Sequence, residues 1–126
     1  MTNLTDLTVD SLTVGTYDVP APTTGTLVNN GAVSIKAGVF TLNKGSAITA
    51  TLAEPTVTTD DFKRLVIVSL TAQAHTVAIA TDGFGHGGAN YIKATFGGAI
   101  GDSVSLIAFQ GYWYVTGFQN VTFGTA

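Results

Sequence analysis

The residues with the greatest capacity for binding chemistry form one aromatic cluster near the C-terminal end. Tyr112, Trp113 and Tyr114 are consecutive. Successive side chains of a strand point to opposite faces, so both tyrosines would share one face and Trp113 would take the other. Aromatic rings of this kind stack on sugars, on nucleotide bases or against another protein. We expect Trp113 in the core, and Tyr112 and Tyr114 at the rim or at a subunit contact.

A glycine-rich run, GFGHGG at 83–88, is the second candidate. Glycine loops that bind phosphate open a helix, because the helix N-terminus holds the anion. Here the pattern returns to a strand at Tyr91, which argues against a phosphate site. We expect a tightly turned surface loop with Phe84 and His86 exposed at its tip, where they would contact a partner.

Catalytic and metal-binding chemistry have little support. The chain has two histidines, His75 and His86, and no cysteine, so a metal site would need carboxylates gathered by the fold. His75 alternates in step with Val77 and Ile79, which indicates a packed or subunit-interface histidine. There is no Gly-x-Ser-x-Gly elbow, and most acidic residues fall in turns or near the N-terminus. We therefore expect no enzyme activity, no metal and no cofactor.

Composition narrows the class of protein further. The 126 residues suit one domain, and 45% are hydrophobic but only 10% charged, against about 25% charged in ordinary proteins. This deficit indicates that a large part of the surface is not left facing water. Five scattered basic residues and a net charge of −3 argue against nucleic acid as a partner. No secretory signal and no bilayer-length apolar run is present, so we expect a chain made in a cytoplasm, with no membrane partner.

The pattern along the chain predicts an all-β domain. Apolar residues alternate with polar ones in roughly ten short segments separated by turns, and no segment has helical periodicity. Asn30-Gly31 predicts a hairpin between its flanking strands. The segments 39–42 and 47–52, separated by a turn, have the alternation of a half-buried antiparallel pair. The segment 65–68 is apolar at every position, so both faces of this strand should be covered.

Another hairpin is expected across Gln110-Gly111, between two further segments with strand patterns. Short strands that are regularly separated by turns are typical of sandwiches, jelly rolls and barrels. The fold class expected is an antiparallel β-sandwich or jelly roll over residues 23–126.

Residues 1–22 are expected to form an extended N-terminal arm. The unit Asp6-Leu7-Thr8-Val9 is echoed by Ser11-Leu12-Thr13-Val14, and the arm ends in Pro20-Ala21-Pro22. Two such short strands cannot bury their own apolar face, so the arm must lie on the domain, on a sister subunit or on another partner. The expected capsid or inter-subunit contact residues of the arm are Leu4, Leu7, Val9, Leu12, Val14 and Tyr17.

Six stretches of the chain resemble a domain common in structural proteins of tailed bacteriophages. They are GSAITATLAEPT at 45–56, DDFKRL at 60–65, TAQAHTV at 71–77, TFGGAIGDSV at 95–104, GYWYV at 111–115 and NVT at 120–122. Their order and spacing match that family. Tyr112 stands where the family often has Lys or another polar residue, which points to a local contact surface.

The resemblance implies a β-rich virion protein, usually a homotrimer. An arm with one domain and no long shaft resembles head decoration, or cement, proteins, which implies the major capsid protein as partner and the outer surface of the capsid as location. The alternative is a tail-fibre module that binds a host surface glycan, and a third possibility is a free lectin-like β-sandwich.

Overall fold

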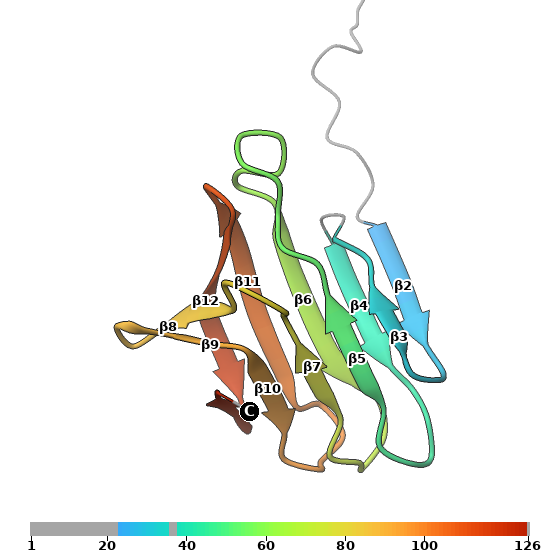
Figure 1. The fold of residues 1–126 in the computed structure, drawn as a ribbon. Coiled ribbons are helices and arrows are strands. Elements are labelled where there is room, and N and C mark those ends of the chain that lie inside the picture. Colours follow the sequence, from blue (N-terminus) through green and yellow to red (C-terminus); the bar gives the residue numbers. More distant parts are fainter. Residues whose placement is uncertain (1–22, 36–37, 126) are drawn as a thin grey trace, which may run out of the picture.

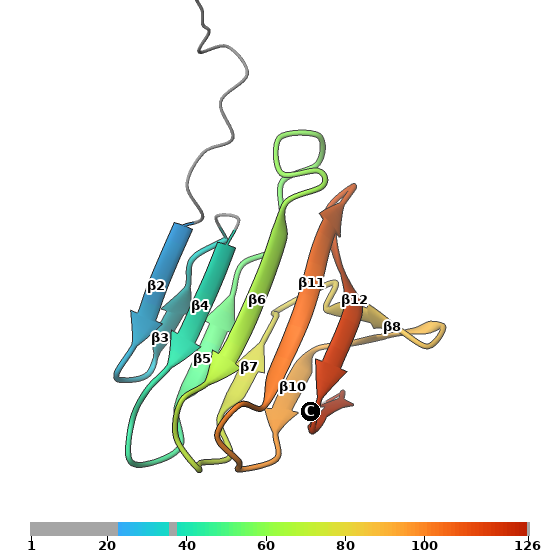
Figure 2. The same cartoon turned by 180° about the vertical axis from the view of Figure 1, so that it is seen from behind.

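The computed structural model describes residues 23–35 and 38–125, and its regular structure is entirely β (Figure 1). Twelve strands form two mixed sheets, one of seven strands and one of five. The sheets lie face to face, and opposite views show the same two layers (Figures 1 and 2). The described residues contain no helix that could cross a membrane.

The strands of each sheet come from both halves of the chain. In spatial order, the seven-stranded sheet contains β2 (Thr23–Leu27), β4 (Gly38–Leu42), β6 (Arg64–Ser69), β11 (Ser103–Phe109), β12 (Tyr112–Gln119), β8 (Phe84–His86) and β9 (Ala89–Tyr91). The five-stranded sheet contains β13 (Val121–Gly124), β10 (Lys93–Phe96), β7 (Thr76–Ala78), β5 (Thr49–Leu52) and β3 (Gly31–Val33).

Strands β2 to β7 wind alternately through the two sheets, and we call this part the N-terminal coil. Each turn of the coil places one strand in each sheet, and every strand pairs in parallel with the equivalent strand of the next turn. Gly38 pairs with Leu65 and Thr49 with Thr76, so the step along the chain from the second turn to the third is identical in the two sheets. The expected antiparallel arrangement is wrong for this half of the domain.

The two turns predicted as hairpins are bends that carry the chain from one sheet to the other. Asn30-Gly31 joins β2 to β3, and neither residue has the positive φ of a tight hairpin turn. The Asn30 side chain instead accepts a hydrogen bond from the Thr49 N–H, at 2.8 Å, on the next turn of the coil. The bend after Leu42 likewise leads from β4 into β5 in the opposite sheet. Asn30 therefore stabilises the stacking of turns and not a hairpin.

The C-terminal half is mainly antiparallel, as expected. Strands β11 and β12 form the predicted hairpin, with Gln110 at φ 50° and Gly111 at φ 87°, the two positive values of a type I′ turn. Strand β11 continues the sheet by pairing antiparallel with β6, and β10 does the same with β7. This half closes one end of the N-terminal coil, while the other end of the described coil is formed by β2 and β3.

The core lies between the sheets and is built from the inward positions of both. Trp113 is fully buried, as predicted, and its indole Nε1–H donates to the Ala53 carbonyl at 2.9 Å. His75 is also fully buried, which confirms the prediction of a packed histidine. Burying an indole or imidazole requires partners for the ring nitrogens, and both side chains have them.

Candidate contact surface

An aromatic strip crosses the outer face of the seven-stranded sheet. Phe109 and Tyr112 are directly opposite each other on β11 and β12, and the next outward pair is Ile107 and Tyr114. The rings of Tyr112 and Tyr114 lie 6.2 Å apart. Tyr114 is 41% exposed and Phe109 42% exposed. Both predicted tyrosines therefore lie on one outward face, and they have aliphatic and aromatic neighbours.

Phe62 extends the strip beyond the end of the sheet. Its ring lies 5.4 Å from the ring of Phe109, and its side chain is 67% exposed. The residue has φ 68°, a left-handed conformation that costs a non-glycine residue about 1 kcal/mol or more. A large apolar side chain is thus held in solvent at an energetic cost, which is typical of a functional position. No sequence pattern pointed to this residue, because Phe62 and Phe109 are far apart along the chain.

Two carboxylates fix the loop that presents Phe62. The Lys63 ammonium donates to Asp60 at 2.6 Å and the Thr56 N–H donates to the other oxygen at 2.7 Å; these bonds lower the pKa of Asp60. Asp61 accepts the Gln110 N–H at 2.8 Å and the Gln110 side-chain amide at 2.6 Å. The loop is therefore bound to the β11–β12 turn, and the position of Phe62 is fixed by contacts within the domain.

The rest of this outer face is nearly free of charge. Arg64 is the only Lys, Arg, Asp or Glu on the described strands of the seven-stranded sheet. Rows of small and β-branched side chains cross it, with Val39 beside Val66 and Val66 beside Ser105. The strand that contains Val66 was expected to be covered on both faces, but Val66 is only half-buried. The part of the chain that the structure describes supplies no second covering layer.

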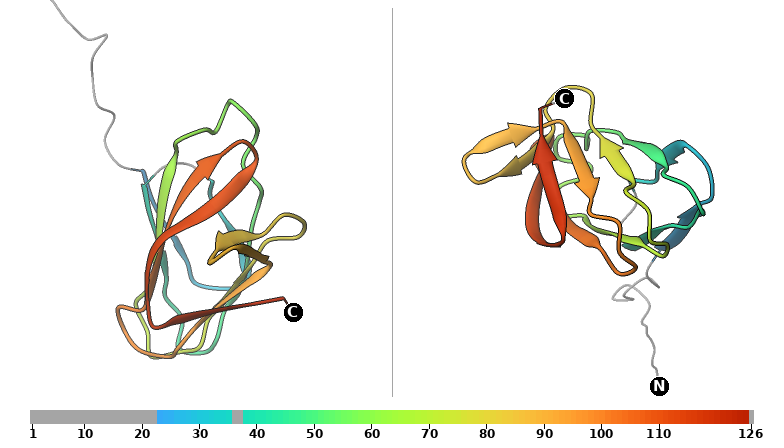
Figure 3. Two further views of the ribbon diagram at one scale, coloured as in Figure 1. Left: turned by 90° about the vertical axis from the view of Figure 1, so that its left-hand side faces the viewer. Right: turned by 90° about the horizontal axis from the view of Figure 1, so that it is seen from below.

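The predicted glycine-rich loop is a hairpin that projects from the side of the domain (Figure 3). Strands β8 and β9 are joined by Gly87 and Gly88, both with positive φ. The expected exposure of Phe84 is wrong, because this side chain is fully buried. Strand β8 pairs in parallel with β12, with Phe84 opposite Trp113, so the two aromatic side chains share the inward face.

His86 lies in an aromatic cluster on the opposite side of this hairpin from Tyr114. Its ring lies 4.8 Å from that of Phe123 and 5.2 Å, edge to face, from that of Phe118. His86 is half-buried in this cluster, whose third phenylalanine ring, that of Phe84, lies 5.8 Å from Phe123. The exposed member is Phe118, at 48%. His86 was expected to be exposed at a loop tip, but its side chain is half-buried against these rings.

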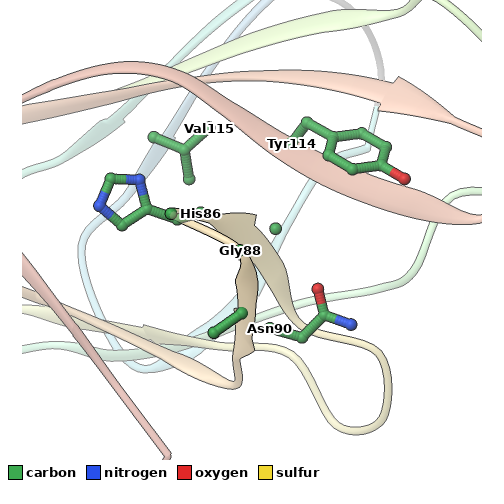
Figure 4. Close-up of a pocket in the computed structure, with 8 residues that line it drawn as sticks. His86, Gly88, Asn90, Tyr114 and Val115 are labelled. Atoms are coloured by element: carbon green, nitrogen blue, oxygen red, sulfur yellow. The ribbon is translucent and has the colours of Figure 1, made fainter.

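A hollow of about 410 Å³ lies beside the paired strands β8 and β12 and is lined by residues 85–90, Tyr114 and Val115 (Figure 4). The Tyr114 ring covers Gly85 so closely that a Cβ there would lie 2.8 Å from the ring. Asn90, the strand partner of Gly85, is exposed beside it. Figure 4 shows Tyr114 and Asn90 toward one side of the hollow, while the His86 ring points away. An aromatic face next to an amide is suited to a small polar ring.

Two further acidic residues, Glu54 and Asp102, accept hydrogen bonds that hold loops of the domain. Burial raises the pKa of Asp102, but hydrogen bonds from the Ala99 N–H and the Asn120 side chain outweigh this and leave the pKa below its usual value. Glu54 accepts the N–H groups of Thr81 and Asp82. No group of three or more potential metal ligands occurs among the described residues.

Comparisons with protein families, with curated proteins and with solved structures found no match to this chain. The resemblance to phage structural proteins therefore depends on the sequence stretches alone. The expected contact residues of the arm, from Leu4 to Tyr17, lie outside the described residues.

Proposed function

We propose that the chain is a structural protein of a tailed-phage virion, a homotrimeric decoration protein that binds the major capsid protein on the outer surface of the head and stabilises the shell. The observation that carries the proposal is the composition of the outer face of the seven-stranded sheet. This face has an exposed aromatic strip, and Arg64 is the only charged residue on the described strands of the sheet. The trimer and the capsid come from the sequence resemblance. The contact surface comes from the geometry.

The composition of this face is that of a protein–protein interface. Interface centres are enriched in Tyr, Phe and Arg and depleted in Lys, Glu and Asp. Phe62, Phe109, Tyr112 and Tyr114 lie near Arg64, which is opposite Ile107 on the neighbouring strand. In a trimer, three weak contacts to a shell act together, because the first attachment raises the effective concentration of the other two.

We class the architecture as a two-sheet sandwich and not as a jelly roll.

Light scattering after gel filtration tests the proposal. We expect a mass near three times 12.9 kDa for the full chain. Val66→Glu places a charge at the centre of the outer face and should give monomers. The matched control is Thr51→Glu, on the outer face of the five-stranded sheet, which should leave the trimer intact. A wild-type monomer at high concentration would refute the trimer.

Binding to the shell is tested separately. Heads of the virus that encodes this chain, prepared without it, are mixed with purified protein and sedimented. We expect wild type and Thr51→Glu to sediment with the heads and Phe62→Ser to remain in solution. Equal sedimentation of wild type and both variants with the heads would show that Phe62 is not part of the contact.

The hollow beside β12 favours a second candidate function, binding of a host surface glycan in a tail-fibre or lectin-like module. Sugars stack their apolar faces on aromatic rings, and side-chain amides bind their hydroxyl groups. Glycan-array signal lost in both Tyr114→Ala and Asn90→Ala, but kept in the exposed control Thr116→Ala, would support it. Trp113 and Phe84 are unsuitable for this test because both are fully buried.

A further inference from the structure

The N-terminal coil has an open end formed by two neighbouring strand edges. Among the described strands, β2 is the edge of the seven-stranded sheet and β3 is the edge of the five-stranded sheet, and they are joined by one short bend. Figure 1 shows these two strands together at one side of the domain. At this end the inward side chains of Leu27 and Ile35 are only partly buried against the core. Open edges of this kind readily accept another strand.

The chain itself continues from this end. Residues 1–22 lead directly into Thr23, the first residue of β2. The step from the first turn of the coil to the second runs from Thr23 to Gly38 in one sheet and from Gly31 to Ala50 in the other. The segment 1–22 is longer than either step, so it is long enough for one further turn.

We propose that residues 5–14 add a further turn to the open end of their own coil. Residues 5–9 would pair in parallel with β2, with Thr8 beside Thr26. Residues 12–14 would pair in parallel with β3, with Thr13 beside Ala32. Asp10 and Ser11 would form the bend between the two strands.

This register satisfies the side-chain alternation in both sheets at once. Leu7 and Val9 fall beside Gly25 and Leu27, and Leu12 and Val14 fall beside Gly31 and Val33, which are all inward positions by the alternation of their strands. Thr8 and Thr13 fall on the outer faces, where Thr26 already bonds to Thr41 at 2.8 Å. A slip of one residue would reverse every side chain, so the alternation fixes which face of the sheet each residue takes.

The charged residues also agree with this register. Asp6 would be outward beside Thr24, Asp10 would lie in the bend and Asp18 would lie in the link back to β2. These three carboxylates account for the net charge of −3, and none would enter the core. The link, residues 15–22, is longer than the segment 34–37 that makes the equivalent crossing from β3 to β4.

The chain's own segment is favoured over other occupants because it is tethered at the edge that it would cover. A short flexible tether gives an effective concentration in the millimolar range, which a second copy or another protein rarely reaches. The inference is independent of the proposed function, since the open end needs a cover whatever the outer face binds. It reassigns Leu7, Val9, Leu12 and Val14 from partner contacts to the core.

Paired cysteines test the register, because the chain has no cysteine of its own. Two matched pairs are made in the full chain, Thr8→Cys with Thr26→Cys, and Thr13→Cys with Ala32→Cys. Two crossed pairs use the same four positions, Thr8→Cys with Ala32→Cys, and Thr13→Cys with Thr26→Cys. Directly opposite residues of adjacent strands are within disulfide range, whereas residues on opposite outer faces of the domain are not.

We expect the matched pairs to close at least about tenfold faster than the crossed pairs, and within single molecules, because only the matched pairs meet the distance limit of a disulfide. A short thiol-specific bifunctional reagent repeats the comparison without the dihedral demands of a disulfide, and Trp113 fluorescence checks that each reduced variant is folded. Equal rates for all four pairs, no bridge in either experiment, or bridges between molecules would each overturn the proposal. Val66→Glu tests the trimer separately, so the two failures are distinguishable.

Discussion

Replacing His75 by asparagine tests the hydrogen-bond network of the core. Nδ1 of His75 accepts the Ile48 N–H at 2.9 Å, and Nε2 lies 2.9 Å from the Thr71 hydroxyl. That hydroxyl donates its own hydrogen to the Lys44 carbonyl at 2.7 Å, so it must accept from Nε2–H. The neutral ring protonated on Nε2 satisfies every partner. A proton on Nδ1 would point at the Ile48 N–H, so two donors would face each other and this hydrogen bond would be lost.

The network makes the free energy of unfolding depend on pH. Burial lowers the pKa of His75, whereas a histidine in the unfolded chain titrates near its ordinary pKa of about 6.5. The unfolded state therefore takes up the proton first as the pH falls. The free energy of unfolding has its full value above about pH 6.5. It decreases as the pH falls from there to the folded-state pKa of His75, and it does not change further below that pKa. While folded His75 stays neutral, the loss is about 1.4 kcal/mol at pH 5.5 and about 2 kcal/mol at pH 5.

Urea unfolding between pH 7.5 and 5, followed by the fluorescence of Trp113 at fixed protein concentration, measures this loss. In His75→Asn the amide oxygen can accept from the Ile48 N–H but does not titrate, so its pH dependence should be smaller by the amounts above. The carboxylates with a lowered pKa lose their stabilising effect only at more acid pH. Equal pH dependence of the two proteins would refute the reasoning.

Three further changes are predicted. Asp102→Ala removes the acceptor for the Ala99 N–H and should cost about 2 kcal/mol, measured by urea unfolding. Gly83→Ala should cost about 3 kcal/mol or more in stability, because Gly83 has φ +73° and a Cβ there would lie within 3 Å of the Tyr91 backbone. Gly87→Ala is the matched control: Gly87 also has a positive φ but has open space around it, so this change should cost about 1 kcal/mol. Phe62→Gly relieves a left-handed backbone, so the stability of the domain should change by less than about 1 kcal/mol. The variant should keep the mass of a trimer but no longer sediment with the heads; undiminished binding to the heads would contradict the contact role of Phe62.

The sequence predicted the strands and their inward faces well, because alternation reports burial directly. The all-β class, the core position of Trp113 and the β11–β12 hairpin are confirmed by the structure. Alternation is the same whether a strand pairs with its neighbour in sequence or with the equivalent strand of the next turn. The sequence pattern therefore could not distinguish the parallel coil from antiparallel hairpins. Asn30-Gly31 was predicted to form a hairpin turn, but the Asn30 side chain instead accepts a hydrogen bond from Thr49 on the next turn of the coil.

The residues of the candidate contact surface were predicted in part. Tyr112 and Tyr114 were identified because consecutive aromatic residues on a strand define a face. Phe62 was missed because its place beside Phe109 depends on a loop that Asp61 ties to the β11–β12 turn. Phe84 was assigned to a loop tip because glycines surround it, but its strand joins the sheet edge and turns the ring inward.

The identical step of the two sheets, from Gly38 to Leu65 in one and from Thr49 to Thr76 in the other, has a consequence for how this domain can change length. A tandem duplication of residues 38–64 would insert one whole turn between the existing second and third turns. Both sheets would keep their register, because the duplicated length equals the step from the second turn to the third in each sheet. The Asn30 bond to the next turn and the closing C-terminal strands would be undisturbed. The domain is in this sense modular along one axis, and lineages or designers can lengthen it without rebuilding its ends.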